Sequence, residues 1–306
     1  MNPVLVVGSV ALDSVETPFG KIDDAIGGSG TYFAASASHL ARVQVVGVVG
    51  GDYPLEKFEP LRQRGVDFTG LERSDGESFR WRGRYRHDLN AAETLETRLG
   101  VFSQFRPRIP EAFRQAPYVF LGNIDPRLQL DVLRQVERPR LVACDTMNFW
   151  IESRRNELLE LLEQVDILLL NDAEARQLTE QYNLVKAARW ILRRGPKYVV
   201  IKKGEHGAYM FSEHAVFFAP AYPLEELFDP TGAGDSFAGG FMGYLAQCGR
   251  IDEPTLRRAV VYGSTLGSFA VERFSIDRLL EISMADITYR LEEFRRLVAF
   301  QEELDP

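Results

Sequence analysis

A short acidic and glycine-rich stretch, Asp229-Pro-Thr-Gly-Ala-Gly-Asp235, has the residue types and spacing best suited to chemistry in this chain. The run Gly232-Ala233-Gly234 is small enough to leave its backbone N–H groups bare, and a predicted helix, Ser236–Gln247, follows it. Unpaired N–H groups and the positive dipole at a helix start form an anion site. Asp235 stands in the first turn beside this site. Phosphoryl transfer to a hydroxyl needs this pair of features, because N–H groups stabilise developing negative charge and the carboxylate accepts the hydroxyl proton.

The structural alternative is an ordinary glycine-rich helix start in which Asp235 complements the helix dipole. That alternative does not account for the glycines directly before Asp235, because Ser or Thr would cap the helix better. We therefore favour the catalytic interpretation. Since a helix N-terminus favours the ionised carboxylate, we expect a low pKa for Asp235 and hence a weak base.

The same stretch resembles the C-terminal signature of the PfkB family of carbohydrate and nucleoside kinases, the ribokinase-like group. The signature D-T/P-x-G-A-G-D is matched by Asp229–Asp235. The resemblance implies an ATP-dependent kinase that uses Mg²⁺, with Asp235 as general base and Gly232-Ala233-Gly234 as anion hole. It also implies that the nucleotide is contacted by Thr231, Gly232 and Gly234.

A glycine pair, Gly27-Gly28, precedes a second helix of small residues. Such a pair lets a polar ligand approach the backbone closely, although a plain turn is the structural alternative. The resemblance implies that this is the substrate loop. The family usually has Asn at the position of Tyr32; Tyr can still hydrogen-bond or stack, so we keep Tyr32 among the candidates for substrate binding.

Two further candidates for substrate binding follow predicted strands. Asp13 ends the first strand segment, and Gly122-Asn123 follows the strand Tyr118–Leu121. Ligands of doubly wound sheets bind beyond the carboxyl ends of the strands, where a carboxylate can accept hydrogen bonds from two hydroxyls. The family uses an Asp at the position of Asp13 to hold substrate hydroxyls. A plain turn explains Gly122-Asn123 equally well.

On the nucleotide side, Asn171 and Glu174 open a helix and are fully explained as a capping box. The family's Asn-x-x-Glu motif at this place handles Mg²⁺ and phosphate through water, so we keep both interpretations for Glu174. The resemblance also implies nucleotide contacts at Lys202, Gly204 and Gly207, while a solvated charge is the alternative for a lysine. A helical segment at 264–270 matches the place where the family packs adenine. The next residues, 272–275, lack the family's glycine-bearing cation loop, so activation by a monovalent cation is doubtful.

Apolar strand-like runs and helix-like runs alternate along the chain, which predicts an α/β fold. We expect one ribokinase-like domain over residues 1–306, a doubly wound, mostly parallel sheet with helices on both faces. We predict strands at Val4–Val7, Val43–Val49, Tyr118–Leu121, Leu141–Cys144, Asp166–Leu170 and Tyr198–Ile201, a hairpin at Gly207–Phe211 and Ala215–Ala219, and helices at Thr31–Ala41, Pro54–Arg64, Ser236–Gln247, Pro254–Val271 and Asp286–Phe300.

Segments of about 14–26 and 77–87 interrupt this alternation, and the resemblance implies that they form a small β-sheet lid. Within the second segment, arginines at 80, 82, 84 and 86 alternate with Trp81, Gly83, Tyr85 and His87, which is the period of a strand. An inward aromatic face fits a neutral acceptor, whereas an inward arginine face fits an acceptor that carries phosphate or carboxylate. In many relatives the lid forms a dimer, so we predict a homodimer.

The chain has 306 residues, a formal net charge of −8 and two cysteines. The charge argues against nucleic-acid or anionic-membrane partners, and the few cysteines indicate a cytoplasmic protein without a disulfide framework. The histidines and cysteines lack zinc spacing. We expect phosphorylation of a hydroxyl on a small sugar or polyol. A nucleoside is the alternative acceptor, and a catalytically silent sugar-binding relative is the alternative class.

Overall fold

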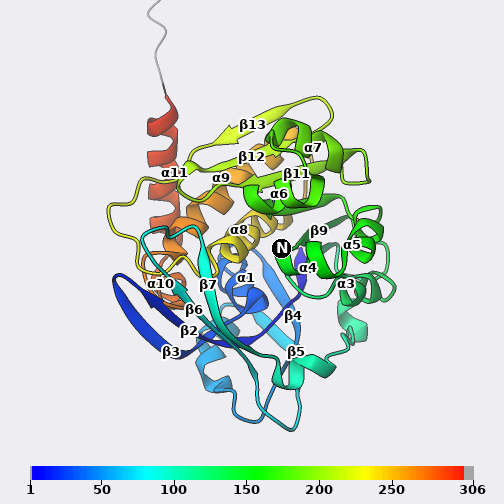
Figure 1. The fold of residues 1–306 in the computed structure, drawn as a ribbon, viewed down its shortest axis with the longest axis vertical. Coiled ribbons are helices and arrows are strands. Elements are labelled where there is room, and N and C mark those ends of the chain that lie inside the picture. Colours follow the sequence, from blue (N-terminus) through cyan, green and yellow to red (C-terminus); the bar gives the residue numbers. More distant parts are fainter. Residues whose placement is uncertain (1, 300–306) are drawn as a thin grey trace, which may run out of the picture.

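The computed structural model describes residues 2–299, which form one large and one small β-sheet (Figure 1). Within these residues the large sheet has nine strands in the order β13-β12-β11-β10-β9-β8-β1-β4-β5. Its strands pair in parallel except where β12 joins β11 and β13. The strands are β1 (Pro3–Val7), β4 (Arg42–Val49), β5 (Val66–Arg73), β8 (Tyr118–Leu121), β9 (Leu141–Asp145), β10 (Ile167–Asn171), β11 (Tyr198–Lys202), β12 (Ala208–Phe211) and β13 (Val216–Ala219).

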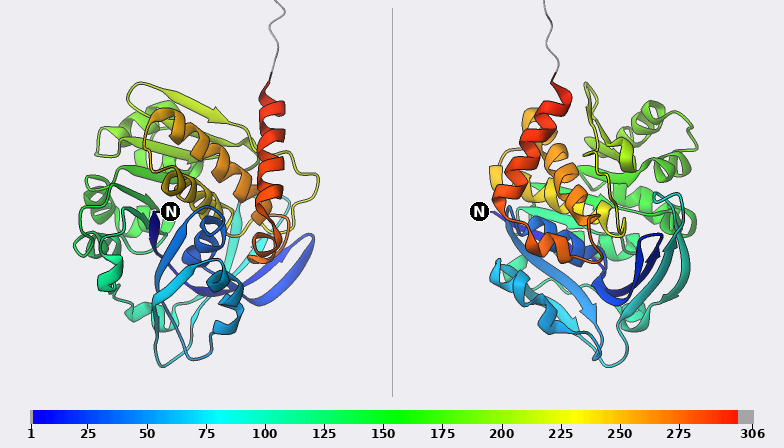
Figure 2. Two further views of the ribbon diagram at one scale, coloured as in Figure 1. Left: turned by 180° about the vertical axis from the view of Figure 1, so that it is seen from behind. Right: turned by 90° about the vertical axis from the view of Figure 1, so that its left-hand side faces the viewer.

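Helices cover both faces of the large sheet (Figure 2). Alternate residues of β1 enter different cores, Val4 and Val6 on one face and Leu5 and Val7 on the other. Burial on both faces explains why these strands are continuous apolar runs. One core is closed by α1 (Ser29–Ala37), α2 (Glu59–Gln63), α8 (Ala233–Cys248), α9 (Glu253–Ala270), α10 (Asp277–Glu281) and α11 (Met284–Val298); the other by α3 (Pro126–Leu133), α4 (Asn148–Ser153), α5 (Arg155–Leu162), α6 (Asp172–Thr179) and α7 (Leu184–Leu192).

The predicted doubly wound fold is confirmed, but some predicted elements were wrong. Strand β5 was missed, because its apolar residues alternate with Asp67, Thr69 and Glu72 near the sheet edge. The predicted helix at 54–64 is a 3₁₀ turn, Leu55–Phe58, followed by α2, because Pro60 has no N–H to continue the first helix. Phe300 and the C-terminal tail lie outside the described residues.

The small sheet is the predicted lid and lies over one end of α1 and α8 (Figure 1). It pairs two antiparallel hairpins through parallel contact between β2 and β6. Its strands occur in the order β3-β2-β6-β7 and are β2 (Ala11–Thr17), β3 (Gly20–Gly27), β6 (Phe79–Tyr85) and β7 (Ala92–Arg98). The sequence did not predict β7, because all seven of its residues are exposed and it lacks an apolar face. The predicted homodimer stays a prediction.

Helix α8 lies tightly between α1 and α9 because glycines face both neighbours. A Cβ on Gly239 would come within 2.4 Å of the carbonyl oxygen of Phe33 in α1. A Cβ on Gly240 would come within 2.8 Å of the carbonyl oxygen of Tyr262 in α9. The backbones therefore touch, and this contact offsets the poor helix propensity of glycine. Among the described residues, no helix is long and apolar enough to cross a membrane.

Candidate active site

The N-terminus of α8 has the geometry of the predicted anion hole. Gly232, which caps the helix, has a left-handed backbone with φ of 72°, and no side chain caps the helix. Within residues 2–299 the backbone N–H of Gly234 has no hydrogen-bond partner. The ring of Tyr32 lies against the loop. A Cβ added to Gly232 would be only 2.2 Å from the nearest atom of that ring. The N–H of Gly234 is thus free for an anion, whereas the N–H of Ala233 donates to the carbonyl oxygen of Pro230 at 3.2 Å.

Three neighbouring strands of the large sheet bring polar and charged residues to this helix end. Asp145 ends β9, and Asn171 and Lys202 end β10 and β11 in the same register. The ammonium of Lys202 donates to Asp145 Oδ2 at 2.8 Å. A Cβ on Gly234 would lie 3.0 Å from Lys202 Nζ, so the ammonium also contacts the anion hole. The carboxyl edge of the sheet and the start of α8 therefore form one polar site.

Burial determines the basicity of Asp235. Desolvation and the nearby Asp145 carboxylate raise its pKa to about 7, and Lys202 opposes the rise only in part. Our expectation of a low pKa was wrong, because it considered the helix dipole without the loss of solvent. A carboxylate with a pKa near neutrality is a better general base than an ordinary aspartate.

Glu174 is both a helix cap and a neighbour of the charged group. Its carboxylate accepts from Asn171 N–H at 2.7 Å, and Asn171 Oδ1 accepts from Glu174 N–H at 2.8 Å, which is the predicted capping box. Burial and Asp145 raise the pKa of Glu174 to about 7, although Lys202 opposes them. The cap thus fixes Glu174 where it faces the other charges, and its role toward Mg²⁺ stays a prediction.

The acceptor side of the site is built on Asp13. Asp13 Oδ2 accepts from the N–H of Gly28 at 3.2 Å, and a Cβ on Gly27 would overlap the same carboxylate. Our placement of Asp13 at the end of the first strand was wrong, because it lies within β2 of the lid. Burial raises its pKa to about 7, with Asp229 and Asp235 adding to the rise while the Gly28 hydrogen bond opposes it. The predicted glycine pair and Asp13 thus form one polar surface.

Strand pairing divides the lid into two faces. Asp13, Trp81 and Tyr85 share the inner face, since Asp13 pairs with Trp81 in parallel register and β-strand side chains alternate. The Tyr85 hydroxyl lies 3.3 Å from Thr231 Oγ1, next to the anion hole. On the outer face the arginines pair with lid and loop carboxylates: Arg80 with Asp24 and Asp52, Arg82 with Asp23, and Arg84 with Glu16. The aromatic face therefore turns inward, as the first of our two alternatives has it.

This arrangement predicts that Arg82 and Arg84 do not contact the acceptor substrate. Replacing both Arg82 and Arg84 with Gln should leave the KM for the acceptor unchanged, because their exposed ion pairs contribute only about 0–1 kcal/mol. Steady-state kinetics of the double variant measure this. A loss of tenfold or more in kcat/KM would mean that the arginines face the acceptor during turnover.

The remaining predicted site residues are glycines and an asparagine, and some of them are explained by local packing or hydrogen bonding. Asn123 Oδ1 accepts from the indole N–H of Trp150 at 2.9 Å, and Gly122 lies against Ser29. Gly207 contacts the carbonyl of Ala219, which explains it structurally. Gly204 has a φ of 51° and lies against Asn90, in the turn between β6 and β7, so the lid reaches the loop that we predicted to contact the nucleotide.

Sequence reasoning missed Asp145, the partner of Lys202. Our predicted strand ended at Cys144, one residue before it. The signal was present, because an Asp directly after a buried strand lies at the carboxyl edge of the sheet. The alternation of arginines with other residues in the lid strand could not show that Trp81 and Tyr85 face the site.

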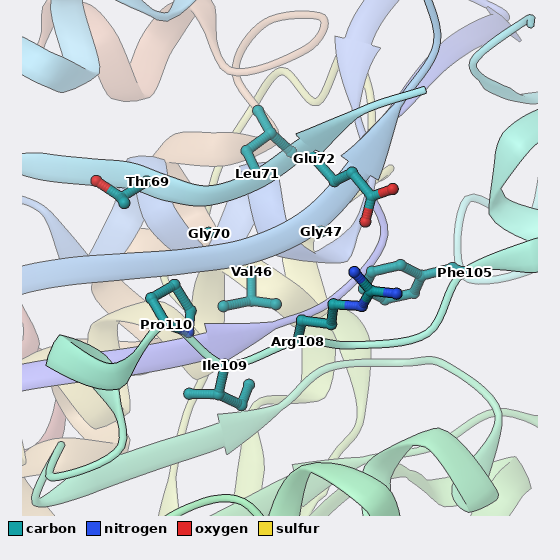
Figure 3. A pocket seen from close by; sticks show the side chains of 10 residues that line it. All are labelled: Val46, Gly47, Thr69, Gly70, Leu71, Glu72, Phe105, Arg108, Ile109 and Pro110. Carbon is teal, nitrogen blue, oxygen red and sulfur yellow. The ribbon is translucent and has the colours of Figure 1, made fainter. Parts of the chain in front are cut away.

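A separate hollow of about 270 Å³ opens beside β4 and β5 (Figure 3). Arg108 and Glu72 flank it, and Val46, Ile109 and Pro110 supply apolar lining. None of the predicted site residues lines it. The candidate active site is therefore located by its converging side chains and backbone donors and not by this hollow.

Comparison with known proteins agrees with this geometry. Residues 4–281 match the model of the pfkB family of carbohydrate kinases. A cytidine kinase from Thermococcus kodakarensis is 31% identical over 263 residues, which cover 82% of this chain and 93% of that protein. The chain therefore belongs to the pfkB family and is a phosphotransferase.

Solved structures share the fold at lower identity. One is the nucleoside kinase of Methanocaldococcus jannaschii, an archaeal member of the ribokinase family. Its TM-score is 0.77 at 20% sequence identity, and the match covers 96% of this chain and 99% of that chain. A ribokinase-type protein from Escherichia coli, solved with ATP and Mg²⁺, has a TM-score of 0.80 at 18% identity, with coverages of 96% and 100%. These similarities establish the ribokinase-like fold.

Proposed function

We propose that this protein is an ATP-dependent nucleoside kinase, which transfers the terminal phosphoryl group of ATP to a hydroxyl of a nucleoside. One observation carries the proposal: Asp13 shares the inner lid face with Trp81 and Tyr85. A carboxylate can accept hydrogen bonds from two sugar hydroxyls, and aromatic rings can stack on a planar base. The sequence alone favoured a sugar or polyol. The inward aromatic face and the similarity to a cytidine kinase move the proposal to a nucleoside.

The neutral character of the inner face supports an uncharged acceptor. The side chains that strand pairing assigns to this face include Ala11, Asp13, Val15, Ile22, Ala25, Phe79, Trp81, Tyr85, Ala92, Thr94 and Thr97. Within this set Asp13 is the residue that can carry charge at neutral pH. A phosphate on the acceptor would meet the Asp13 carboxylate on this lid face and none of the lid arginines, which is unfavourable.

In this proposal the reaction depends on groups at the start of α8. Asp235 accepts the proton of the attacking hydroxyl, and the N–H groups of Gly232 and Gly234 stabilise charge on the transferred group. Asp13 orients the acceptor from the opposite side. Tyr85 and Thr231 close the lid edge and exclude water.

The residues present fit ATP and Mg²⁺. Asp145 and Glu174 supply carboxylates at the sheet edge, and α8 offers open backbone donors. Within residues 2–299 no three His, Cys, Asp or Glu side chains form a metal cage. This suits Mg²⁺, which is bound through one or two carboxylates together with phosphates and water. When bound, Mg²⁺ would neutralise phosphate charge.

A panel of acceptors tests the proposal. Purified protein with ATP and Mg²⁺ should phosphorylate at least one of cytidine, adenosine, inosine and uridine with a kcat/KM well above that for ribose or fructose. Trp81→Ala should raise the KM for the nucleoside by about 10–100-fold, since base stacking contributes about 1–3 kcal/mol. The same variant should leave the weak reaction with free ribose unchanged. The Arg82→Gln, Arg84→Gln protein is the matched lid control.

Two results would contradict this function. Free sugars phosphorylated as well as nucleosides, with no effect of Trp81→Ala, would favour a sugar kinase. Binding of an acceptor without turnover of any panel member would favour the catalytically silent alternative.

A further inference from the structure

The candidate site has one side-chain ammonium among several carboxylates. The side chains of Lys202 and Asp145 are 17% and 6% exposed, and their atoms meet at 2.8 Å. Glu174 and Asp235 are the other acidic neighbours of this ammonium. Burial disfavours the charged form of Lys202, but Asp145 and Glu174 outweigh burial and raise its pKa overall. The lysine is therefore a charged group inside the site.

The ammonium occupies a position between two possible partners. On one side is Asp145, and on the other is the backbone of Gly234 in the anion hole, where an added Cβ would lie 3.0 Å from Nζ. An anion held by the N–H groups of that helix end would thus lie within reach of the same ammonium. Lys203, the next residue, points elsewhere and lies 5.9 Å from the ring centre of Tyr209.

We propose that Lys202 changes partner during the catalytic cycle: Asp145 holds its ammonium in the empty enzyme, and the ammonium pairs with the terminal phosphoryl oxygens when a nucleoside triphosphate binds. Lys202 is then a catalytic residue that touches the transferred group, and Asp145 is a positioning residue. The proposal rests on the phosphotransferase activity but not on the identity of the acceptor.

Physical reasons favour a changing partner over a purely structural ion pair. A buried ion pair contributes little net stability, because desolvation of both charges cancels most of their attraction. Lysine suits a moving contact, since its charge is compact and its stem is flexible. Arginine would bind the carboxylate through two hydrogen bonds and release it less readily.

The first measurement separates triphosphate from shorter nucleotides. Isothermal calorimetry should compare a non-hydrolysable imido analogue of ATP, ADP and AMP, each with Mg²⁺. Lys202→Met should weaken the binding of the ATP analogue by about 10–100-fold, which is the range for a lost hydrogen bond to a charged group. Binding of AMP should be unchanged, and Lys202→Arg should restore part of the affinity. Lys203→Met removes the same charge one residue away and should bind all three nucleotides like the unmodified protein.

The second measurement uses inorganic tripolyphosphate without divalent metal and follows thermal unfolding. Asp145→Asn should lower the unfolding midpoint of the empty protein, because the ammonium loses its partner. Tripolyphosphate should then raise the midpoint of this variant more than that of the unmodified protein, since the anion supplies the missing partner. Lys202→Met should show a smaller rise than the unmodified protein. Lys202→Gln provides a second variant if Lys202→Met does not fold.

Three outcomes would overturn the inference: equal losses for the ATP analogue and AMP in Lys202→Met, an affinity loss in Lys203→Met instead, or midpoint shifts that change in the same direction in Asp145→Asn and Lys202→Met. None of these results depends on the acceptor panel. A nucleoside or a sugar acceptor is compatible with either result, whereas a complete lack of nucleotide binding in the unmodified protein would refute the kinase proposal itself.

Discussion

Asp235→Asn should reduce kcat by about 10²–10⁴-fold, the range for removal of a general base. The substitution keeps the size of the side chain at the start of α8 and removes the group that accepts the hydroxyl proton. The unmodified enzyme should lose kcat/KM as the pH falls below about 7, because protonation of Asp235 abolishes its basicity. The apparent pKa belongs to the group of interacting carboxylates as a whole. Steady-state kinetics from pH 5.5 to 9 measure both effects.

Unfolding provides the control for this variant. The pKa of Asp235 is raised above its unfolded value of 3.8, so ionisation costs stability as the pH rises from about 4 to about 7. Above pH 7 that cost is fully present. The Asn variant lacks this cost and should therefore be more stable than the unmodified protein at pH 8. Near-normal turnover in a folded Asn variant would remove Asp235 from the mechanism.

Gly232→Ala should lower kcat by about 10²–10³-fold, as expected when an anion hole loses its geometry. The new Cβ would come within 2.2 Å of the Tyr32 ring, and the left-handed φ of 72° disfavours any residue with a Cβ. Either the loop or Tyr32 must move, which displaces the N–H groups that we propose bind the phosphate. Kinetics with saturating ATP measure the loss.

Gly65→Ala is the matched control for this substitution. Gly65 has a similar φ of 86°, but a Cβ there meets no atom within 4 Å. It should cost about 1 kcal/mol in unfolding free energy and leave turnover unchanged. If both glycine variants lose turnover equally, global strain and not the anion hole explains the effect. If Gly232→Ala keeps normal turnover, the loop does not act as proposed.

The sequence predicted those features that depend on residues close together in the chain. The Asp229–Asp235 stretch predicted a helix start with open donors, and α8 begins there. The capping box of Asn171 and Glu174 was also predicted from spacing alone. In both cases the relevant contacts lie within a few residues, so local rules suffice.

Properties that depend on distant chain segments could not be predicted. The pKa of Asp235 follows from burial beside Asp145, which is 90 positions away in the sequence (235 − 145). The partner of Lys202 and the inward face of Trp81 depend on strand order and on parallel pairing between β2 and β6. Strand β7 could not be found from hydrophobic periodicity, because it has no buried face.

The glycine contacts of α8 also bear on how this enzyme could acquire new substrates. Where Gly239 meets α1 and Gly240 meets α9, a side chain added at either glycine would overlap a backbone carbonyl of the neighbouring helix. Mutation at these glycines can therefore hardly alter the spacing between the proposed substrate loop that opens α1 and the proposed anion hole that opens α8. The inner lid face, by contrast, consists of side chains such as Trp81 that can be exchanged without moving the helices. Changes of specificity should accumulate in the lid, while the reaction itself stays the same.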